Sequence, residues 1–145
     1  MNRKDSEKLL ETAKLGRLGV FDGEPYVVPV NFVYYSGKIC FHCAKEGRKI
    51  QAVLKEPRVC FEVDEFLGLK EGEKPCHYGA YYRSVIAWGQ ARTVEGREEK
   101  KEALARMMIK QVGTGRQWVF DKEMVDKVTV VEIAIERMTG KCRLP

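Results

Sequence analysis

Short β segments joined by tight turns constrain this chain more than any other feature of its sequence. Residues 18–21 and 26–35 flank the turn Asp22-Gly23-Glu24-Pro25, and Ser36-Gly37-Lys38 leads directly into residues 39–44. Connections this short join antiparallel neighbours, because a parallel crossover needs roughly a dozen residues. The pattern therefore predicts hairpins and a largely antiparallel sheet.

Three later segments also have β character, at residues 58–66, 81–94 and 129–137. In the last one Val131 and Ile133 flank Glu132, and this alternation is typical of a strand with one buried face. Helical patterns predict short helices at residues 5–15, 47–55 and 97–110, the last with Leu104, Met107 and Met108 in the core. Five or six antiparallel strands with short helices predict a mainly β (α+β) fold that curls into a barrel.

The connection at residues 68–79 is rich in Gly, Glu and Lys. This composition predicts a loop that is mobile or acts as a lid, with His77 at its surface. Gly89 lies inside the strand predicted at residues 81–94. A glycine in such a position indicates a bulge or a close approach of two backbones.

The length of 145 residues favours a single domain that spans residues 1–145. Acidic and basic side chains are mixed along the chain, with a net charge of +5. No arginine-rich tract or zinc-finger spacing accompanies this charge, which argues against a nucleic-acid partner. No apolar run approaches the ~20 residues of a membrane span, and the first residues lack the apolar stretch of a signal peptide. We therefore expect a cytoplasmic protein without a membrane partner.

The spacing Cys40-x-x-Cys43 occurs in metal-binding and redox motifs. Here both cysteines lie in one predicted strand, where residues three apart point to opposite faces. We therefore favour structural or incidental cysteines and predict no metal site. The odd total of five cysteines agrees with a reducing compartment.

The start of the second predicted helix, Gly47-Arg48-Lys49, carries the strongest chemical signal. The N–H groups in the first turn of a helix lack intrahelical partners and lie at the positive end of the peptide dipole, so they attract phosphate. Arg48 adds a planar fork for two phosphate oxygens, Lys49 adds a mobile charge, and Gly47 allows a close approach. The sequence predicts a phosphate site here, and a solvated helix start is the alternative.

Several motifs follow one another along nearly the whole chain. They are Gly16-Arg17-Leu18-Gly19, Val28-Pro29-Val30-Asn31-Phe32, Phe41-His42-Cys43-Ala44, Gly47-Arg48-Lys49, Pro57-Arg58-Val59, Tyr82-Arg83-Ser84-Val85, Gly89-Gln90-Ala91 and Met138-Thr139-Gly140-Lys141. This ordered set resembles the flavin-binding split barrels related to pyridoxamine 5′-phosphate oxidase. Within them it is most similar to the nitroimidazole-resistance, or nitroimidazole reductase-like, branch. The oxidase's C-terminal substrate segment is not recognisable, so the resemblance does not extend to pyridoxamine phosphate oxidation.

The resemblance implies a six-stranded antiparallel split β-barrel with short flanking helices. It also implies a homodimer with FMN bound at the interface between two barrels. Arg48 and Lys49 would hold the phosphate, and Gly47 stands where the oxidases often carry a phosphate-binding hydroxyl. The other positions that the resemblance directs at the flavin are Val28, Pro29, Val30 and Asn31, through their backbone groups, and His42, Cys43, Ala44 and Ser84.

The implied function is that of an FMN-dependent oxidoreductase that reduces a small electron-poor substrate. In such an enzyme the flavin performs the redox step and the protein supplies placement and electrostatics. His42 is the candidate catalytic residue, because an imidazole titrates near neutral pH and could bond the cofactor or deliver a proton. A histidine satisfied by backbone carbonyls at a barrel edge is the alternative. A flavin-storing or flavin-sensing protein and a haem or deazaflavin (F420) binder are the other candidate functions.

Overall fold

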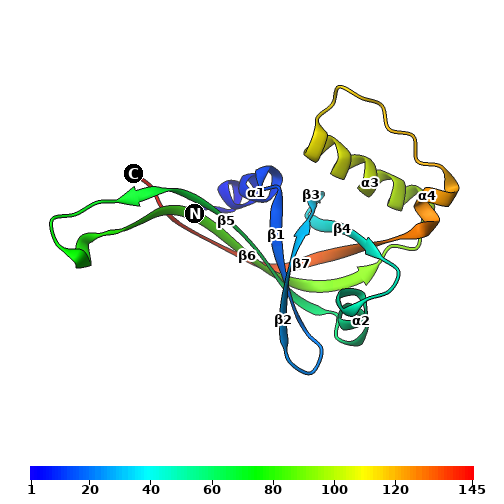
Figure 1. Ribbon diagram of the computed structural model, residues 1–145, viewed down its shortest axis with the longest axis horizontal. Coiled ribbons are helices and arrows are strands. Elements are labelled where there is room, and N and C mark those ends of the chain that lie inside the picture. Colours follow the sequence, from blue (N-terminus) through cyan, green and yellow to red (C-terminus); the bar gives the residue numbers. More distant parts are fainter.

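Seven strands form one sheet in the computed structural model, which describes residues 1–145 (Figure 1). In spatial order they are β2 (Pro25–Asn31), β1 (Leu15–Phe21), β5 (Arg58–Lys70), β6 (Gly79–Thr93), β7 (Val128–Arg143), β4 (Lys38–Ala44) and β3 (Val33–Tyr35). Every pair of neighbours is antiparallel. The mainly β, antiparallel fold is therefore confirmed, with seven strands in place of six.

The additional strand arises at Phe32, where the single strand predicted at residues 26–35 divides into β2 and β3. β2 pairs with β1 whereas β3 pairs with β4, so the chain changes its partner across this residue. The Phe32 side chain is fully buried and meets Phe61 edge to face, with ring centroids 4.8 Å apart. Burial of this ring fixes the point at which the chain crosses, and β2 then lies against β4, which curls the sheet toward a barrel.

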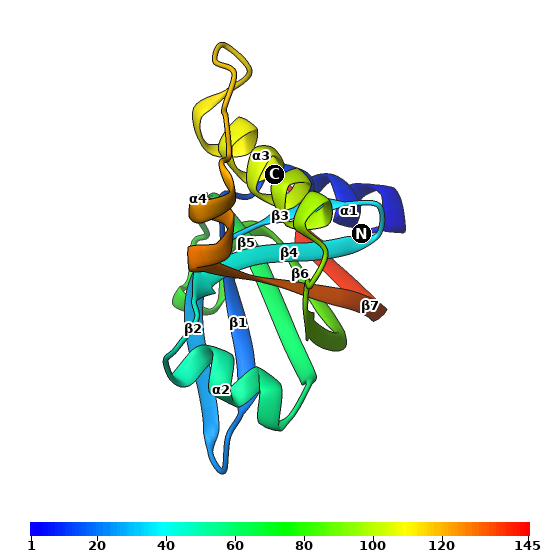
Figure 2. The ribbon, with the colours of Figure 1, turned by 90° about the vertical axis from the view of Figure 1, so that its right-hand side faces the viewer.

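The interior of the barrel is filled by apolar side chains that alternate along the strands, as Leu18 and Val20 do in β1. Two helices, α1 (Arg3–Thr12) and α2 (Arg48–Lys55), add their apolar faces to the same cluster. α1 begins two residues before its predicted start, because the side chain of Asn2 accepts a hydrogen bond from the backbone N–H of Asp5 at 2.8 Å. Figure 2 shows α2 lying across β1, at the opposite side of the barrel from α1.

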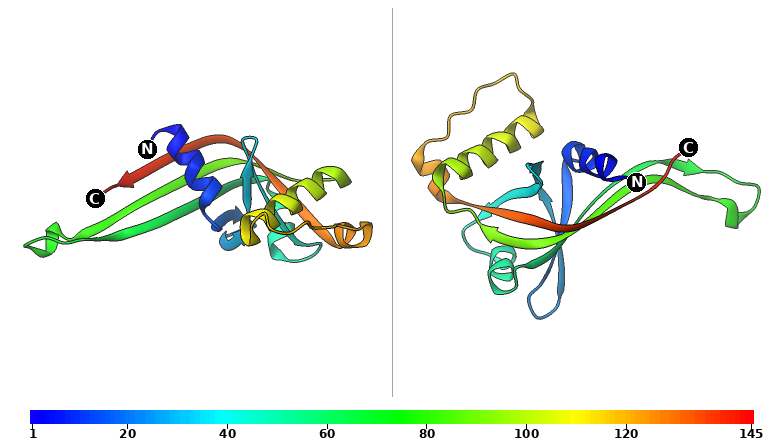
Figure 3. Two further views of the ribbon diagram at one scale, coloured as in Figure 1. Left: turned by 90° about the horizontal axis from the view of Figure 1, so that it is seen from above. Right: turned by 180° about the vertical axis from the view of Figure 1, so that it is seen from behind.

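A long two-stranded arm carries most of the loop predicted at residues 68–79 at its tip (Figures 1 and 3). β5 continues to Lys70 and β6 begins at Gly79, so only residues 71–78 connect the two strands. A register shift between Phe66 and Gly68 lets the pairing continue past this glycine, whose φ is 139°. The loop prediction was wrong for residues 68–70 because pairing with β6 outweighs the low strand propensity of Gly68 and Lys70.

Two further helices, α3 (Arg97–Val112) and α4 (Lys122–Lys127), pack over β3 and β4 around a second apolar cluster (Figure 2). Met107 is buried in this cluster, as predicted, whereas Met108 is only partly buried. The sequence did not predict α4. It is one short segment whose first turn is capped by Asp121, which accepts a hydrogen bond from the N–H of Met124 at 2.8 Å.

Gly89 occupies a point where two backbones meet closely, as its position in the strand predicted. The register of β6 against β7 shifts between Trp88 and Gly89. A Cβ at residue 89 would collide with the carbonyl group of Ala134. None of the helices has the length and apolarity that are needed to span a membrane.

Candidate functional site

The N-terminus of α2 lacks a side-chain cap. Gly47 stands at the N-cap position with φ at 126°, a left-handed conformation that favours glycine. The first intrahelical bond runs from the N–H of Gln51 to the carbonyl of Gly47, at 3.1 Å. The N–H groups of residues 48–50 therefore have no partner within the helix, and they form the donor set that an anion requires.

The Arg48 guanidinium is engaged by carboxylates of the β1–β2 turn. Its Nε donates to Asp22 Oδ2 at 2.8 Å, and its Nη2 donates to Asp22 Oδ1 at 3.1 Å and to Glu24 Oε1 at 2.6 Å. The same group stacks on the ring of Tyr26, 4.1 Å from its centroid. These bonds lower the pKa of the Asp22 carboxyl. The sequence did not reveal these partners, and they leave only Nη1 of Arg48 without a carboxylate.

Lys49 is the cation of this helix start that forms no ion pair. Its Nζ lies 5.7 Å from the centroid of the Phe41 ring, and its side chain is partly buried. Its charge also acts on two residues of β4, where it lowers the pKa of His42 and opposes the rise that burial causes in the pKa of Cys43. Lys49 thus influences both residues electrostatically, and the assignment of the three residues to one site stays a prediction.

The His42 imidazole faces α3 rather than the barrel interior. Its Nδ1 lies 3.4 Å from the sulfur of Met107, and its Nε2 takes part in no hydrogen bond within the chain. Partial burial, and after it the positive charge of Lys49, lowers the pKa of His42 below its usual value. The ring is therefore neutral at neutral pH and presents a free polar nitrogen.

A cleft of about 200 Å³ opens beside His42, between β4, α3 and α4. Its other walls are the apolar side chains of Leu104, Met107, Met108, Phe120, Met124 and Val128. No charged residue lines it. Sequence reasoning missed this cleft, because its lining comes from three separate segments, at residue 42, residues 104–108 and residues 120–128, and includes a helix that was not predicted.

The predicted residues of β2 divide between the interior and the surface. The side chains of Val28 and Val30 belong to the main core, whereas Pro29 and Asn31 are exposed. β2 is an edge strand that pairs only with β1, so backbone groups along its free edge remain available. Contact between a flavin and these backbone groups stays a prediction. Ala44 ends β4 opposite Val128 and is exposed.

Cys40 and Cys43 point to opposite faces of β4, as the strand spacing predicted. Cys40 is buried in the cluster beneath α3, and Cys43 packs against the core on the other side. Both thiols are free, and no three His, Cys, Asp or Glu side chains gather into a metal site. The Cys-x-x-Cys spacing therefore does not create a shared ligand pair.

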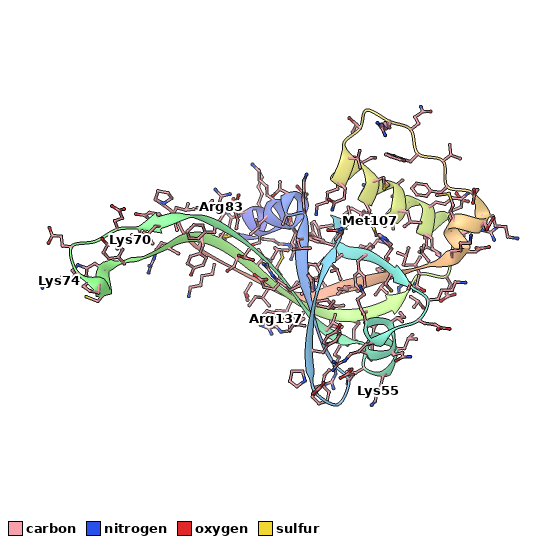
Figure 4. All side chains as sticks on the ribbon, in the orientation of Figure 1. Lys55, Lys70, Lys74, Arg83, Met107 and Arg137 are labelled. Carbon is pink, nitrogen blue, oxygen red and sulfur yellow. The ribbon has the colours of Figure 1, made fainter.

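Ser84 lies on the arm, paired with Asp64 of β5 and Lys141 of β7. Figure 4 labels its neighbour Arg83 on the arm and Lys55 at the end of α2, well separated along the long axis of the molecule. No hydrogen bond joins Ser84 to Arg48 or Lys49 within one chain. His77, in the connection at the tip of the arm, is exposed, as predicted.

The family model described as pyridoxamine 5′-phosphate oxidase matches residues 2–142 of the chain. No curated protein matches it. Among solved structures, a proposed 5-nitroimidazole antibiotic resistance protein of Bacteroides thetaiotaomicron is 30% identical, with a TM-score of 0.83. That match covers 96% of this chain and 82% of the other chain.

Two more distant structures share the fold. The flavocytochrome of Azotobacter vinelandii is 20% identical with a TM-score of 0.88, and the match covers 99% of this chain and 68% of that one. The FAD and haem binding protein of Mycobacterium smegmatis is 17% identical with a TM-score of 0.89, over 99% of this chain and 73% of that one. The family match over nearly the whole length confirms the resemblance of the sequence motifs, and the chain belongs to the pyridoxamine 5′-phosphate oxidase family.

Proposed function

We propose that this protein binds FMN, with the phosphate at the N-terminus of α2, and that it reduces small electron-poor compounds. The observation that carries the proposal is the uncapped start of α2, where Lys49 is a cation without a carboxylate partner. A dianionic phosphate requires this combination of free N–H donors and a mobile positive charge.

The residues at this helix start fit a phosphate group. Gly47 presents no side chain, and the space in which its Cβ would lie is open. Lys49 and the N–H groups of residues 48–50 supply the donors. Arg48 adds Nη1, and its Nε and Nη2 become available when the phosphate displaces Asp22 and Glu24. Displacement of Glu24 costs little because its side chain is 70% exposed, whereas Asp22 is 18% exposed and accepts two hydrogen bonds, so it is held more firmly.

The relatives support a flavin over other phosphate ligands. The structures from Azotobacter and Mycobacterium are a flavocytochrome and an FAD and haem binding protein, and the Bacteroides relative is a proposed nitroimidazole resistance protein. We propose FMN rather than FAD, because one phosphate satisfies the donors of α2. A flavin supplies reversible hydride and electron transfer when it is bound. The chain's own part is to hold the phosphate, to offer the backbone edge of β2 to the ring, and to keep His42 neutral beside it.

Two copies of the chain would complete this site. Ser84 forms no hydrogen bond with α2 within one chain, and the arm that carries it exposes Phe66, Leu69 and Tyr78 at 67%, 58% and 50%. Exposed apolar side chains grouped on one element are typical of a surface that pairs with another protein. In a homodimer the arm of one copy can reach the α2 region of the other, which supplies the polar contact that one chain lacks.

The absorption spectrum of the purified protein tests the proposed cofactor. We expect a yellow protein that releases FMN on denaturation and sediments as a dimer. A Soret band in place of the flavin bands would assign haem instead, and release of FAD would contradict the choice of FMN. A colourless protein that does not retain added FMN would overturn the proposal.

Turnover separates an enzyme from a flavin-storage protein. We expect the protein-bound reduced flavin to be reoxidised by nitrobenzene under anaerobic conditions faster than free reduced FMN. Equal rates for bound and free flavin would indicate storage or sensing, and would contradict the proposed reductase activity.

A further inference from the structure

We propose that the cleft between His42, α3 and α4 is the acceptor site, and that it takes uncharged molecules of a single ring. This assignment rests on the proposed function, because an acceptor site is meaningful only beside a redox cofactor. It goes further in naming the place and the chemical class of the acceptor.

The lining of the cleft excludes charged ligands. Three of the chain's five methionines, Met107, Met108 and Met124, meet there together with Phe120 and two aliphatic side chains. The neighbouring groove differs completely, since Lys45, Lys122 and Lys127 line it with Glu123 and Asp126 and no apolar residue. A charged group in the cleft would lose its hydration without gaining an ionic partner.

The size of the cleft limits its ligand. Its volume of about 200 Å³ lies below the range of roughly 300–1,000 Å³ in which drug-sized molecules bind. A single aromatic ring with small substituents fits this space.

Methionine side chains suit an aromatic ligand in two ways. Their sulfur atoms make favourable contacts with aromatic rings, and their unbranched chains adapt to different shapes. Met107 and Met108 belong to α3 and Met124 belongs to α4, so a ligand in the cleft would contact methionines of both helices (Figure 4 labels Met107). We therefore expect tolerance among ring types and strong discrimination against charge.

His42 supplies the one polar group in the wall. Its Nδ1 contacts only the thioether of Met107, which is a weak hydrogen-bond acceptor, and its Nε2 is free. In the tautomer that carries its proton on Nε2, the imidazole donates a hydrogen bond to a nitro or carbonyl oxygen on the ring, and Nδ1 then only contacts the sulfur of Met107. Val128 in the cleft wall pairs with Ala44, which lies three residues before Gly47, so the chain leads from the cleft directly to the start of α2.

Methionine methyl resonances test the assignment without any turnover. Protein labelled with carbon-13 at the methionine methyl groups is titrated with nitrobenzene, once free of flavin and once after FMN has been added. We expect the signals of Met107, Met108 and Met124 to shift together in both samples, while those of Met1 and Met138 stay in place. The anionic analogue 4-nitrobenzoate should bind at least about tenfold more weakly, because its charge loses hydration in the apolar cleft.

A variant that fills the cleft tests the assignment by mutation, with a methionine outside the cleft as the matched control. Met124 is 52% exposed, so Met124→Trp fills the space without disturbing the core, and Met138→Leu changes a methionine outside the cleft. We expect the affinity for nitrobenzene to fall about tenfold or more in Met124→Trp and to stay unchanged in Met138→Leu.

Three results would overturn the acceptor site. The first is that nitrobenzene does not shift the three methionine signals, and the second is that 4-nitrobenzoate binds as tightly as nitrobenzene. The third is that FMN itself shifts the three signals and prevents nitrobenzene from binding, which would show that the flavin occupies the cleft. The flavin absorption bands of the same samples report separately on the cofactor. Nitrobenzene binding at the three methionines in a protein that retains no FMN would support a ring-binding cleft and overturn the proposed flavin function.

Discussion

The imidazole Nδ1 of His42 lies 3.4 Å from the sulfur of Met107 and joins β4 to α3 across the cleft. A thioether is a weak acceptor, so this contact orients the ring without exhausting its hydrogen-bonding capacity. His42 lines the apolar cleft beside α3, and burial and then the positive charge of Lys49 lower the pKa of its imidazole. The charge and pKa of this one ring therefore respond to both parts of the site.

The pH dependence of stability tests the environment of His42. Its pKa is lowered in the folded protein, first by burial and then by Lys49, so the unfolded chain binds the proton more readily. The stabilising contribution of the neutral ring is complete above about pH 6.5 and is lost as the pH falls below this value. We expect the free energy of unfolding, measured in urea, to fall less between about pH 7 and about pH 5 in the His42→Phe variant than in the unaltered protein. Equal slopes, or an NMR titration of His42 at or above the value of an unfolded peptide, would contradict this account.

Substitution of Met107 tests the packing of α3 on β4. Met107 is 5% exposed, so Met107→Ala leaves a cavity and should lower the free energy of unfolding by about 2–5 kcal/mol. Met107→Leu keeps the volume and should cost less than about 1.5 kcal/mol. Met108→Ala serves as the control because Met108 is only partly buried, and it should cost less than Met107→Ala. Similar losses in the two alanine variants, measured by urea unfolding, would show that α3 is not anchored through Met107.

Gly47 is predicted to stabilise the fold through its backbone conformation. Its φ is 126° and its absent Cβ would meet no atom within 4 Å, so Gly47→Ala introduces strain without a clash. We expect a loss of about 1–2 kcal/mol in the free energy of unfolding. Gly115→Ala is the matched control, since Gly115 has equally open surroundings and no left-handed φ. A loss in Gly115→Ala as large as that in Gly47→Ala would refute the conformational argument.

The hairpin pattern of the sequence was enough to predict the antiparallel sheet, but not where its strands divide or end. Phe32 has the β character of its neighbours, and only its burial against Phe61 shows why the chain changes partner there. Residues 68–70 carry loop-forming side chains, yet they extend β5 because β6 pairs with them. Such outcomes depend on contacts between distant segments, which local propensity does not describe.

The phosphate end of the candidate site could be proposed from the sequence because Gly47, Arg48 and Lys49 are consecutive in the chain, and phosphate binding there stays a prediction. The carboxylates that occupy Arg48 could not, since Asp22 and Glu24 reach it from another hairpin. The cleft was hidden for the same reason. His42 and Met107 are 65 residues apart, and no spacing rule connects them.

The central claim is that Lys49 at the start of α2 holds the phosphate of FMN. The most direct measurement is the dissociation constant of FMN, by fluorescence titration at low salt, for the unaltered protein and for Lys49→Ala and Lys55→Ala. Lys55 lies at the other end of the same helix (Figure 4). Lys55→Ala therefore changes the net charge by the same amount as Lys49→Ala without altering the start of α2. Loss of a charge-assisted bond should weaken FMN binding about tenfold or more in Lys49→Ala, with little change in Lys55→Ala. Unchanged affinity in Lys49→Ala, or equal losses in both variants, would contradict the phosphate site.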